Sequence, residues 1–253
     1  HPNTTAPGDY PIAWCSEYGK GKVFYTSLGH REDIWTSDHY QKHILGGIHW
    51  ALGLAKGDGK PINNRYEVSA EERAAGFKPL FNGINLDGWK LRQKDGAKSW
   101  NVQNGMMVNT VGKGEHGTDI VTNDKFWNFT VRYEYLIPKG SNSGFYLRGR
   151  HEIQIFDDYG KKPAMGGNGA IYSVKPVSLQ ASRRAGEWQE VEATIKGNRI
   201  SVTLNGVQVH ENVEVNRATG SELDANVDQP GSLFVQGDHG AVALRNIRIK
   251  VLD

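Results

Sequence analysis

The feature that most constrains the fold is a change of hydrophobic period near residue 77. From there to residue 253, apolar and polar residues alternate in short runs separated by turn residues, which is the pattern of strands with one buried face. The run RISVTLNGVQV turns at Asn205-Gly206, a dipeptide typical of tight β-hairpins. Helical periodicity is almost absent. We therefore predict an all-β domain over residues 77–253, built as a two-sheet jelly-roll sandwich.

The first 76 residues have a different sequence pattern. Two β-runs, YPIAWCSEYG and GKVFYTSLG, are separated by a Gly-Lys-Gly turn, and a helix is expected over SDHYQKHILGGIHWALGL with Ser37 as its N-cap. Residues 1–54 are thus predicted to form a small α/β segment. Residues 55–76 are predicted to be a linker that ends in a short helix, SAEERAAG, in which Ser69 and Glu72 have capping-box spacing.

Composition limits the partners of the chain. Its 253 residues include 30 basic and 28 acidic side chains, a formal charge of +2, which gives no field suited to nucleic acid or an anionic membrane. No apolar run approaches the roughly 20 residues of a membrane helix. Cys15 is alone, so no internal disulfide can form. The chain begins at His1, which indicates a processed protein or a fragment, and we expect a periplasmic or secreted bacterial protein.

Two groups of residues could hold a metal ion. His39 and His43 lie one helical turn apart, but no acidic residue follows the first as in the zinc-protease pattern, so a polar helix face is the simpler interpretation. Glu115, His116 and Asp119 share a glycine-rich loop that could ligate a hard cation. We predict no catalytic metal and no cofactor, and leave a structural calcium ion open.

The stretch GFYLRGRHEIQIFDDYG carries the strongest candidate site. SGFYLR and HEIQIFD are predicted to pair as a hairpin that turns at Gly149, with Ile153 and Ile155 facing the core. In jelly rolls with a curved sheet, the opposite, concave face binds glycans. That face would carry the polar groups of both strands, which are Tyr146, Arg148, Glu152 and Gln154.

The spacing Glu-x-Gln-x-x-Asp is similar to the Glu-x-Asp-x-x-Glu strand of the laminarinase and lichenase β-glucanases, although an amide replaces the middle carboxylate and the last residue is shorter. In that scheme Glu152 and Asp157 would be nucleophile and general acid. Asp157 falls on the apolar parity, so the scheme needs a bulge at residues 155–156. The competing interpretation is a solvated polar strand face, with Arg148 and Arg150 in surface ion pairs.

Two further segments add groups of the same kind. QGDHG, at residues 236–240, places Asp238 beside His239, and a histidine oriented by a carboxylate is a natural general base near neutral pH. NGAIYSVKP adds Tyr172 and Lys175, which could hydrogen-bond a sugar or stabilise an enolate. Tyr172 could equally be an ordinary core residue.

Six segments together resemble one known family. They are FKPLFNGINLDGW, GSNSGFYLRG, HEIQIFDDYG, GAIYSVKP, GEWQEVEATIKGNRISVTLNGV and QGDHGAVALRNIRIK, and they are similar, in order, to the 3-keto-disaccharide hydrolase domain family, a concanavalin-like jelly roll. The resemblance covers about residues 77–253. In residues 1–54, DYPIAW, GKGKVFYTSLGHREDIW and GGIHWALG resemble the C-terminal end of the trehalose-utilisation (ThuA-like) family, so this segment is expected to be a remnant of a larger domain.

The resemblance implies a carbohydrate substrate and a site around the Glu-x-Gln strand and the Asp-His turn. These correspond to Glu152, Gln154, Asp238 and His239, with Gln236 before an inserted Gly237 that departs from the family pattern. The implied reaction is cleavage of a glycoside already oxidised at C3, by β-elimination and then addition of water.

Within that reaction we expect His239 to be the base, oriented by Asp238, and Glu152 to be the acid at the leaving oxygen. Arg148 or Lys175 would support the enolate. Two alternatives stay open: direct retaining hydrolysis by Glu152 and Asp157, and a non-catalytic carbohydrate-binding module on the same face. The apolar face of the helix in residues 10–54 further predicts docking or a homodimer through that segment.

Overall fold

The structure of the protein is a computed structural model that describes residues 12–57, 68–94, 96–111 and 115–253. The chain forms two compact units, one of residues 9–63 and one that consists mainly of residues 64–253. Most of the predicted linker, residues 58–67, lies outside the described residues. None of the described helices is long and apolar enough to cross a membrane.

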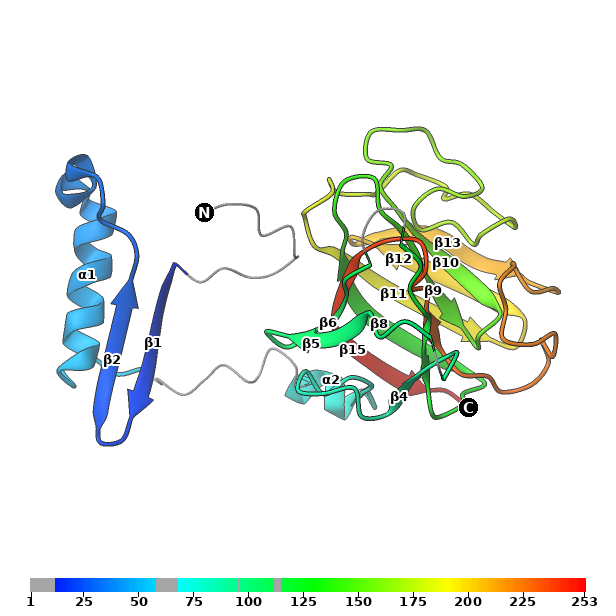
Figure 1. Cartoon of the computed structure of the whole chain (residues 1–253), viewed down its shortest axis with the longest axis horizontal. Coiled ribbons are helices and arrows are strands. Elements are labelled where there is room, and N and C mark those ends of the chain that lie inside the picture. Colours follow the sequence, from blue (N-terminus) through cyan, green and yellow to red (C-terminus); the bar gives the residue numbers. More distant parts are fainter. Residues whose placement is uncertain (1–11, 58–67, 95, 112–114) are drawn as a thin grey trace. The chain divides into compact units, whose positions relative to one another are not determined.

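The N-terminal unit contains the expected hairpin and helix (Figure 1). β1 (Ala13–Tyr18) pairs antiparallel with β2 (Gly21–Thr26), and a 3-10 helix, η1 (Glu32–Thr36), precedes α1 (Asp38–Ala51). Gly47 lets α1 approach β2 closely, because a Cβ at this position would lie 2.3 Å from the ring of Phe24. Ser37 is the N-cap by position, but its side chain makes no capping hydrogen bond.

Only part of the predicted apolar face of α1 is buried. Tyr40 is buried and Ile44 is half-buried, whereas Leu45, Ile48 and Leu52 are exposed by 53%, 45% and 68%. Docking or dimerisation through this unit therefore stays a prediction.

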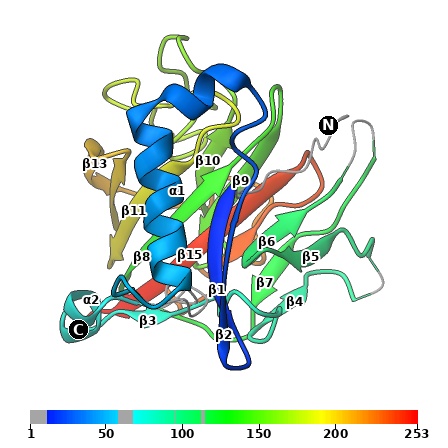
Figure 2. The ribbon, with the colours of Figure 1, turned by 90° about the vertical axis from the view of Figure 1, so that its left-hand side faces the viewer.

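The C-terminal unit is the predicted antiparallel β-sandwich. The smaller sheet has the order β10 (His151–Phe156), β9 (Asn142–Leu147), β14 (Phe234–Val235), β7 (Ile120–Thr122) and β4 (Trp89–Leu91). The larger sheet has the order β13 (Val207–Glu214), β12 (Arg199–Leu204), β11 (Gln189–Lys196), β8 (Phe129–Leu136), β15 (Val242–Val251), β6 (Met106–Asn109) and β5 (Trp100–Gln103), and β3 (Lys78–Pro79) pairs with β15. Figure 2 shows β15 running between β8 and β6.

Local sequence explains several of these elements. The β12–β13 hairpin turns at Asn205 and Gly206, both of which have positive φ, at 51° and 81°. The short helix α2 (Ala70–Ala74) is capped by Ser69, whose hydroxyl accepts a hydrogen bond from the Glu72 N–H at 3.1 Å.

The core lies between the two sheets and is filled by the alternate, apolar residues of each strand. Tyr133 of β8 stacks on Phe145 of β9, with ring centroids 4.0 Å apart. Ile153 and Ile155 of β10 belong to the same core. The predicted jelly-roll fold is confirmed.

Candidate active site

The candidate site lies on the face of the smaller sheet that is turned away from the core. Because the isoleucines of β10 face the core, Glu152 and Gln154 face the other side, as the alternation predicts. Their side chains are nevertheless buried, with 4% and 5% exposure. Neighbouring segments cover the strand: Tyr172 N–H donates to the Glu152 carbonyl at 3.1 Å, and Glu152 N–H donates to the Thr219 hydroxyl at 2.9 Å. The alternative of a solvated polar strand face is therefore excluded.

The carboxyl of Glu152 occupies space that a glycine leaves free. A Cβ at Gly144 on β9 would lie 2.1 Å from Glu152 Oε1. The other oxygen, Oε2, accepts a hydrogen bond from the Tyr146 hydroxyl at 2.8 Å. Burial raises the pKa of Glu152 to about 7, although the hydrogen bond from Tyr146 and the charge of His239 oppose the rise. A glutamate in this state can donate a proton near neutral pH.

Tyr146 fixes the position of this carboxyl. Its ring is stacked on Phe234 of β14 at a centroid distance of 3.8 Å, and it is only 1% exposed. Burial, followed by the nearby Glu152 carboxylate, raises the pKa of Tyr146 far above its ordinary range, so its hydroxyl stays a donor. Tyr146 contacts Glu152 through this hydroxyl, and its predicted contact with substrate stays a prediction.

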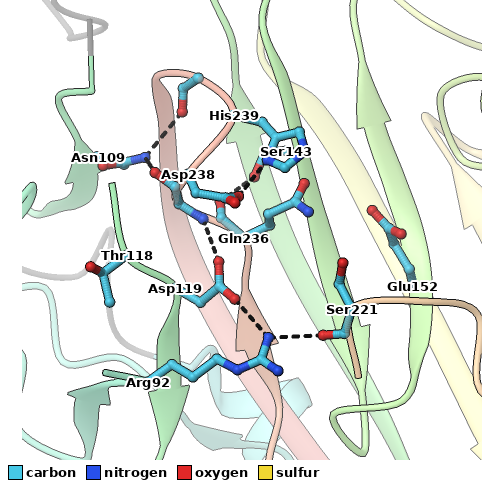
Figure 3. A network of polar contacts seen from close by, with 12 residues as sticks. Arg92, Asn109, Thr118, Asp119, Ser143, Glu152, Ser221, Gln236, Asp238 and His239 are labelled. Carbon is cyan, nitrogen blue, oxygen red and sulfur yellow. Dashed lines mark hydrogen bonds and ion pairs between the residues drawn. The ribbon is translucent and has the colours of Figure 1, made fainter. Parts of the chain in front are cut away.

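Asp238 and His239 form the second part of the site. His239 Nδ1 lies within hydrogen-bonding distance of Asp238 Oδ1 (Figure 3). When Nδ1–H donates to the carboxylate, Nε2 carries the lone pair and can accept a proton. Both side chains are about half exposed, so substrate can reach them. Figure 3 also shows the Gln236 side chain directed toward Glu152.

The turn that carries His239 is held by backbone contacts. Asn109 Nδ2 donates to the carbonyls of Gly237 and Gly240 at 2.8 and 3.0 Å. The Gly237 N–H donates to Asp119 Oδ1 at 3.0 Å. A Cβ at Gly237 would lie 2.2 Å from the Thr118 carbonyl oxygen, so the inserted residue must be glycine for the turn to pack here.

An ion pair joins this turn to a second loop. Arg92 Nη1 donates to Asp119 Oδ2 at 3.0 Å and to the Ser221 carbonyl at 2.8 Å, and Nη2 donates to the Glu222 carbonyl at 2.7 Å. Asp119 therefore contacts both the Asp-His turn, through Gly237, and the 221–222 loop, through Arg92 (Figure 3).

The position predicted for Arg148 is wrong. Arg148 is the first turn residue of the β9–β10 hairpin and has a positive φ of 54°, which takes its side chain out of the strand alternation. Its guanidinium lies 3.5 Å from the ring centroid of Trp127, and its Nε donates to the Trp127 carbonyl at 2.6 Å. Arg150 is likewise buried and pairs with Asp224 at 2.7 Å. Neither arginine contacts Glu152.

The structure also fails to bring Asp157 to Glu152. The pairing of β10 with β9 has no register shift from His151 to Phe156, and Asp157 N–H continues it by donating to the Ser141 carbonyl at 3.3 Å. Asp157 thus keeps the core-side parity, and its carboxylate accepts a hydrogen bond from Gly140 N–H at 2.8 Å. The bulge at residues 155–156 that the β-glucanase scheme needs is absent from this pairing.

Tyr172 and Lys175 lie in one turn beside β10. Tyr172 is next to Glu152 and is 37% exposed. Lys175 is exposed, and its backbone pairs with Ile171. Its charge reaches His210, where it adds to burial in lowering the pKa of that histidine. Of the two residues, only Tyr172 is placed next to the catalytic candidates.

The proposed metal ligands have other partners. Asp119 uses both carboxylate oxygens, one for Gly237 and one for Arg92. His43 Nε2 lies 3.2 Å from the Thr26 hydroxyl. Within the described ranges no cluster of three or more histidine, cysteine, aspartate or glutamate side chains is arranged to hold a metal ion.

A groove elsewhere has less to offer chemically. It has a volume of about 240 Å³ and lies on the outer face of the larger sheet. Its lining includes Arg132, which pairs with Glu192 at 2.6 Å, and Arg248, which pairs with Glu72 at 2.7 Å. Both arginines therefore already form ion pairs with carboxylates of the protein.

Comparison with known proteins gives the family of the sandwich. A family model described as a 3-keto-alpha-glucoside-1,2-lyase-like domain matches residues 76–250. The chain belongs to this family. A second model, described as trehalose utilisation, matches residues 2–51.

Relatives of this 3-keto-alpha-glucoside-1,2-lyase-like domain include a named protein and solved structures. A 3-keto-disaccharide hydrolase of Bacteroides thetaiotaomicron is 26% identical over 232 residues, which cover 71% of this chain and 80% of that protein. A crystal structure from Parabacteroides distasonis, described as a candidate glycosyl hydrolase, is 26% identical with a TM-score of 0.62 and covers 74% of this chain and 99% of its own. Another from the same species is 27% identical, has a TM-score of 0.56 and covers 68% of this chain and 82% of its own. The family makes this protein a hydrolase-type enzyme that acts on carbohydrate.

Four residues of the site carried no signal in the sequence. Arg92, Asn109, Thr219 and Ser221 belong to no motif and reach the site from segments far apart in the chain. Ser221 has a positive φ of 53°, which no local sequence pattern predicts. Hydrogen bonds between side chains and the backbone of distant segments connect them to the site.

Proposed function

We propose that the protein cleaves glycosides whose sugar carries a ketone at C3, by elimination and then hydration. The observation that carries this proposal is the pairing of a protonated carboxyl, Glu152, with a histidine oriented by a carboxylate, His239, on one face of the sheet. A ketone at C3 acidifies the proton on C2, so a histidine is strong enough to remove it.

The first step needs a base at C2 and an acid at the glycosidic oxygen. His239 Nε2 takes the C2 proton, and the C–H electron pair forms the enolate of C2 and C3. The enolate then expels the group on C1, and Glu152 gives its proton to the leaving oxygen. The products are the free aglycone and an enone with a C1–C2 double bond. The raised pKa of Glu152 keeps it protonated for this role.

The developing enolate oxygen needs hydrogen-bond donors, which Arg148 cannot supply from the far end of the hairpin. We assign this role to the side-chain amides of Gln154 and Gln236. The Ile155 N–H donates to Gln154 Oε1 at 3.0 Å, which orients that amide so that its NH₂ end is left for substrate.

The second step returns both protons. Water adds to C1 of the enone and gives a proton to the Glu152 carboxylate, while protonated His239 returns a proton to C2. The net reaction is hydrolysis, and both groups end in their starting states. This agrees with a family whose description names a lyase and a relative that is named a hydrolase.

The alternatives have weaker support. Direct retaining hydrolysis needs two carboxyls about 5–5.5 Å apart on one face of the sheet. Asp157 has the parity of the core-facing residues instead, and its carboxylate accepts a hydrogen bond from Gly140 N–H. A carbohydrate-binding module needs neither a raised carboxyl pKa nor an oriented histidine.

The test compares 3-keto-trehalose with trehalose, with mass spectrometry of the products. We expect cleavage of the keto sugar alone. Glu152→Gln and His239→Ala should each lower kcat by at least about 100-fold. Cleavage of trehalose would contradict elimination. Binding of sugar without any product would favour the binding module.

A further inference from the structure

Tyr172 lies directly beside the proposed acid. Residues 169–172 continue the smaller sheet beyond its edge strand β10: Gln154 N–H donates to the Ala170 carbonyl at 3.0 Å, Tyr172 N–H donates to the Glu152 carbonyl at 3.1 Å, and Ile153 and Ile171 form a bridge. Directly opposed residues of an antiparallel ladder project to the same face. The Tyr172 side chain therefore stands next to Glu152 on the site face.

The turn that carries Tyr172 is fixed in place. The Ser173 hydroxyl donates to the Thr219 carbonyl at 3.0 Å, and Arg217 Nη2 donates to the Ser173 carbonyl at 2.9 Å. A Cβ at Gly166 would lie 3.4 Å from Tyr172 Cε2, so the ring rests against backbone that lacks a side chain. The ring is thus ordered before any ligand arrives.

The ring is also open to solvent, which is unusual on this face. Tyr172 is 37% exposed and Met165, whose carbonyl accepts from Ser173 N–H at 3.2 Å, is 47% exposed. The neighbouring Glu152 and Gln154 are buried polar groups. An exposed ring at the rim of a polar site offers a flat apolar surface, which suits the C–H face of a sugar or an aromatic ring.

The order of segments across the sheet gives the length of the site. Gln236, which precedes the Asp-His turn, pairs with Gly144 on β9 (N···O 2.9 Å), Gly144 pairs with Gln154 on β10, and the segment of Tyr172 comes next. Three strand spacings of about 4.8 Å span roughly 14 Å. This length accommodates two rings, one between His239 and Glu152 and one beyond Glu152.

We infer that Tyr172 is the platform for the leaving group, and that the enzyme prefers an aglycone with a flat apolar face, a pyranose or an aryl ring, to a small alkyl group. This rests on the proposed function, because Glu152 as the acid puts the leaving oxygen on the side of Tyr172. The platform binds the aglycone and takes no part in proton transfer.

The test measures kcat/KM of Tyr172→Ala on 3-keto-trehalose and on methyl 3-keto-α-glucoside. We expect a loss of about five- to tenfold on the disaccharide and less than twofold on the methyl glycoside. Tyr172→Phe, which keeps the ring, should stay near the wild type on both. Tyr159→Ala removes another exposed tyrosine, 13 positions earlier in the same connection between β10 and β11, and is the matched control with no expected effect on either.

Turnover of the methyl glycoside also reports whether the variant is folded. An equal loss on both substrates, or no loss on either, would overturn the platform while leaving the elimination reaction intact. If the wild-type protein cleaves neither keto substrate, the proposed function itself fails and the platform fails with it.

Discussion

Replacing Glu152 with glutamine should stabilise the protein at alkaline pH while it abolishes activity. The pKa of Glu152 is about 7 in the folded protein, against 4.5 for an unburied glutamate. At about 1.4 kcal/mol per pKa unit, this difference is worth about 3 kcal/mol. Between these two values the folded protein binds a proton that the unfolded chain has released, so the contribution of Glu152 to stability falls as pH rises and is lost above pH 7.

The glutamine variant keeps the shape of the side chain and its hydrogen bond with Tyr146 but never ionises. Its free energy of unfolding should match that of the wild type near pH 4, below both pKa values of Glu152, and exceed it by up to about 3 kcal/mol near pH 8.5. Urea titrations of both proteins at several pH values give this difference directly.

In the difference between the unfolding free energies of the two proteins, the contributions of the other titrating groups cancel. Burial lowers the pKa of His151 to about 4, so this histidine makes the fold less stable as pH falls from 6.5 toward 4, which opposes the trend from Glu152. Because His151 is present in both proteins, its effect cancels. Glu211→Gln, the same substitution at an exposed glutamate of β13, is the matched control. A variant difference that stays flat from pH 5 to 8.5 would refute the raised pKa and with it the role of Glu152 as the acid.

Three other changes should affect the same carboxyl. Gly144→Ala places a Cβ 2.1 Å from Glu152 Oε1, so kcat should fall at least about tenfold while the melting temperature, measured by calorimetry, changes by only a few degrees. Tyr146→Phe removes a hydrogen bond that lowers the Glu152 pKa, so the alkaline limb of the kcat/KM profile, expected near pH 7, should move to higher pH. Asp119→Asn removes a charge that raises this pKa, so the same limb should move to lower pH. If the alkaline limb moves in the same direction in Tyr146→Phe and in Asp119→Asn, this account is contradicted.

The fold could be predicted from the sequence because its signals are local. Alternation fixes which residues of β10 face the core, and positive-φ residues fix the hairpins at Asn205 and at Arg148-Gly149. The position of Arg148 could not be predicted in the same way. A residue in a turn no longer follows the parity of the strand before it, and the place of its side chain depends on Trp127, more than 20 positions earlier.

The sequence nominates the candidate reactive groups of the site but not their environment. Glu152, Gln154 and the Asp-His turn were identifiable from composition and spacing. Whether Glu152 is solvated or buried depends on the segments that cover it, such as the turn at Tyr172 and the Thr219 loop, which have no signature of their own. That difference decides the chemistry, because a solvated glutamate would be ionised at neutral pH and could not act as the acid.

The site gives up folding stability at two neighbouring positions, which supports a functional rather than a structural origin. Gly144 sits inside a paired strand, where glycine costs about 0.5–1 kcal/mol relative to alanine, and its one evident effect is to leave room for the Glu152 carboxyl. That carboxyl in turn costs about 3 kcal/mol above pH 7, because it is buried without a neutralising partner of its own. A side chain that never ionises, such as glutamine, would not carry this cost above pH 7. The glycine and the buried acid are therefore explained by function, because the reaction needs a carboxyl that donates its proton.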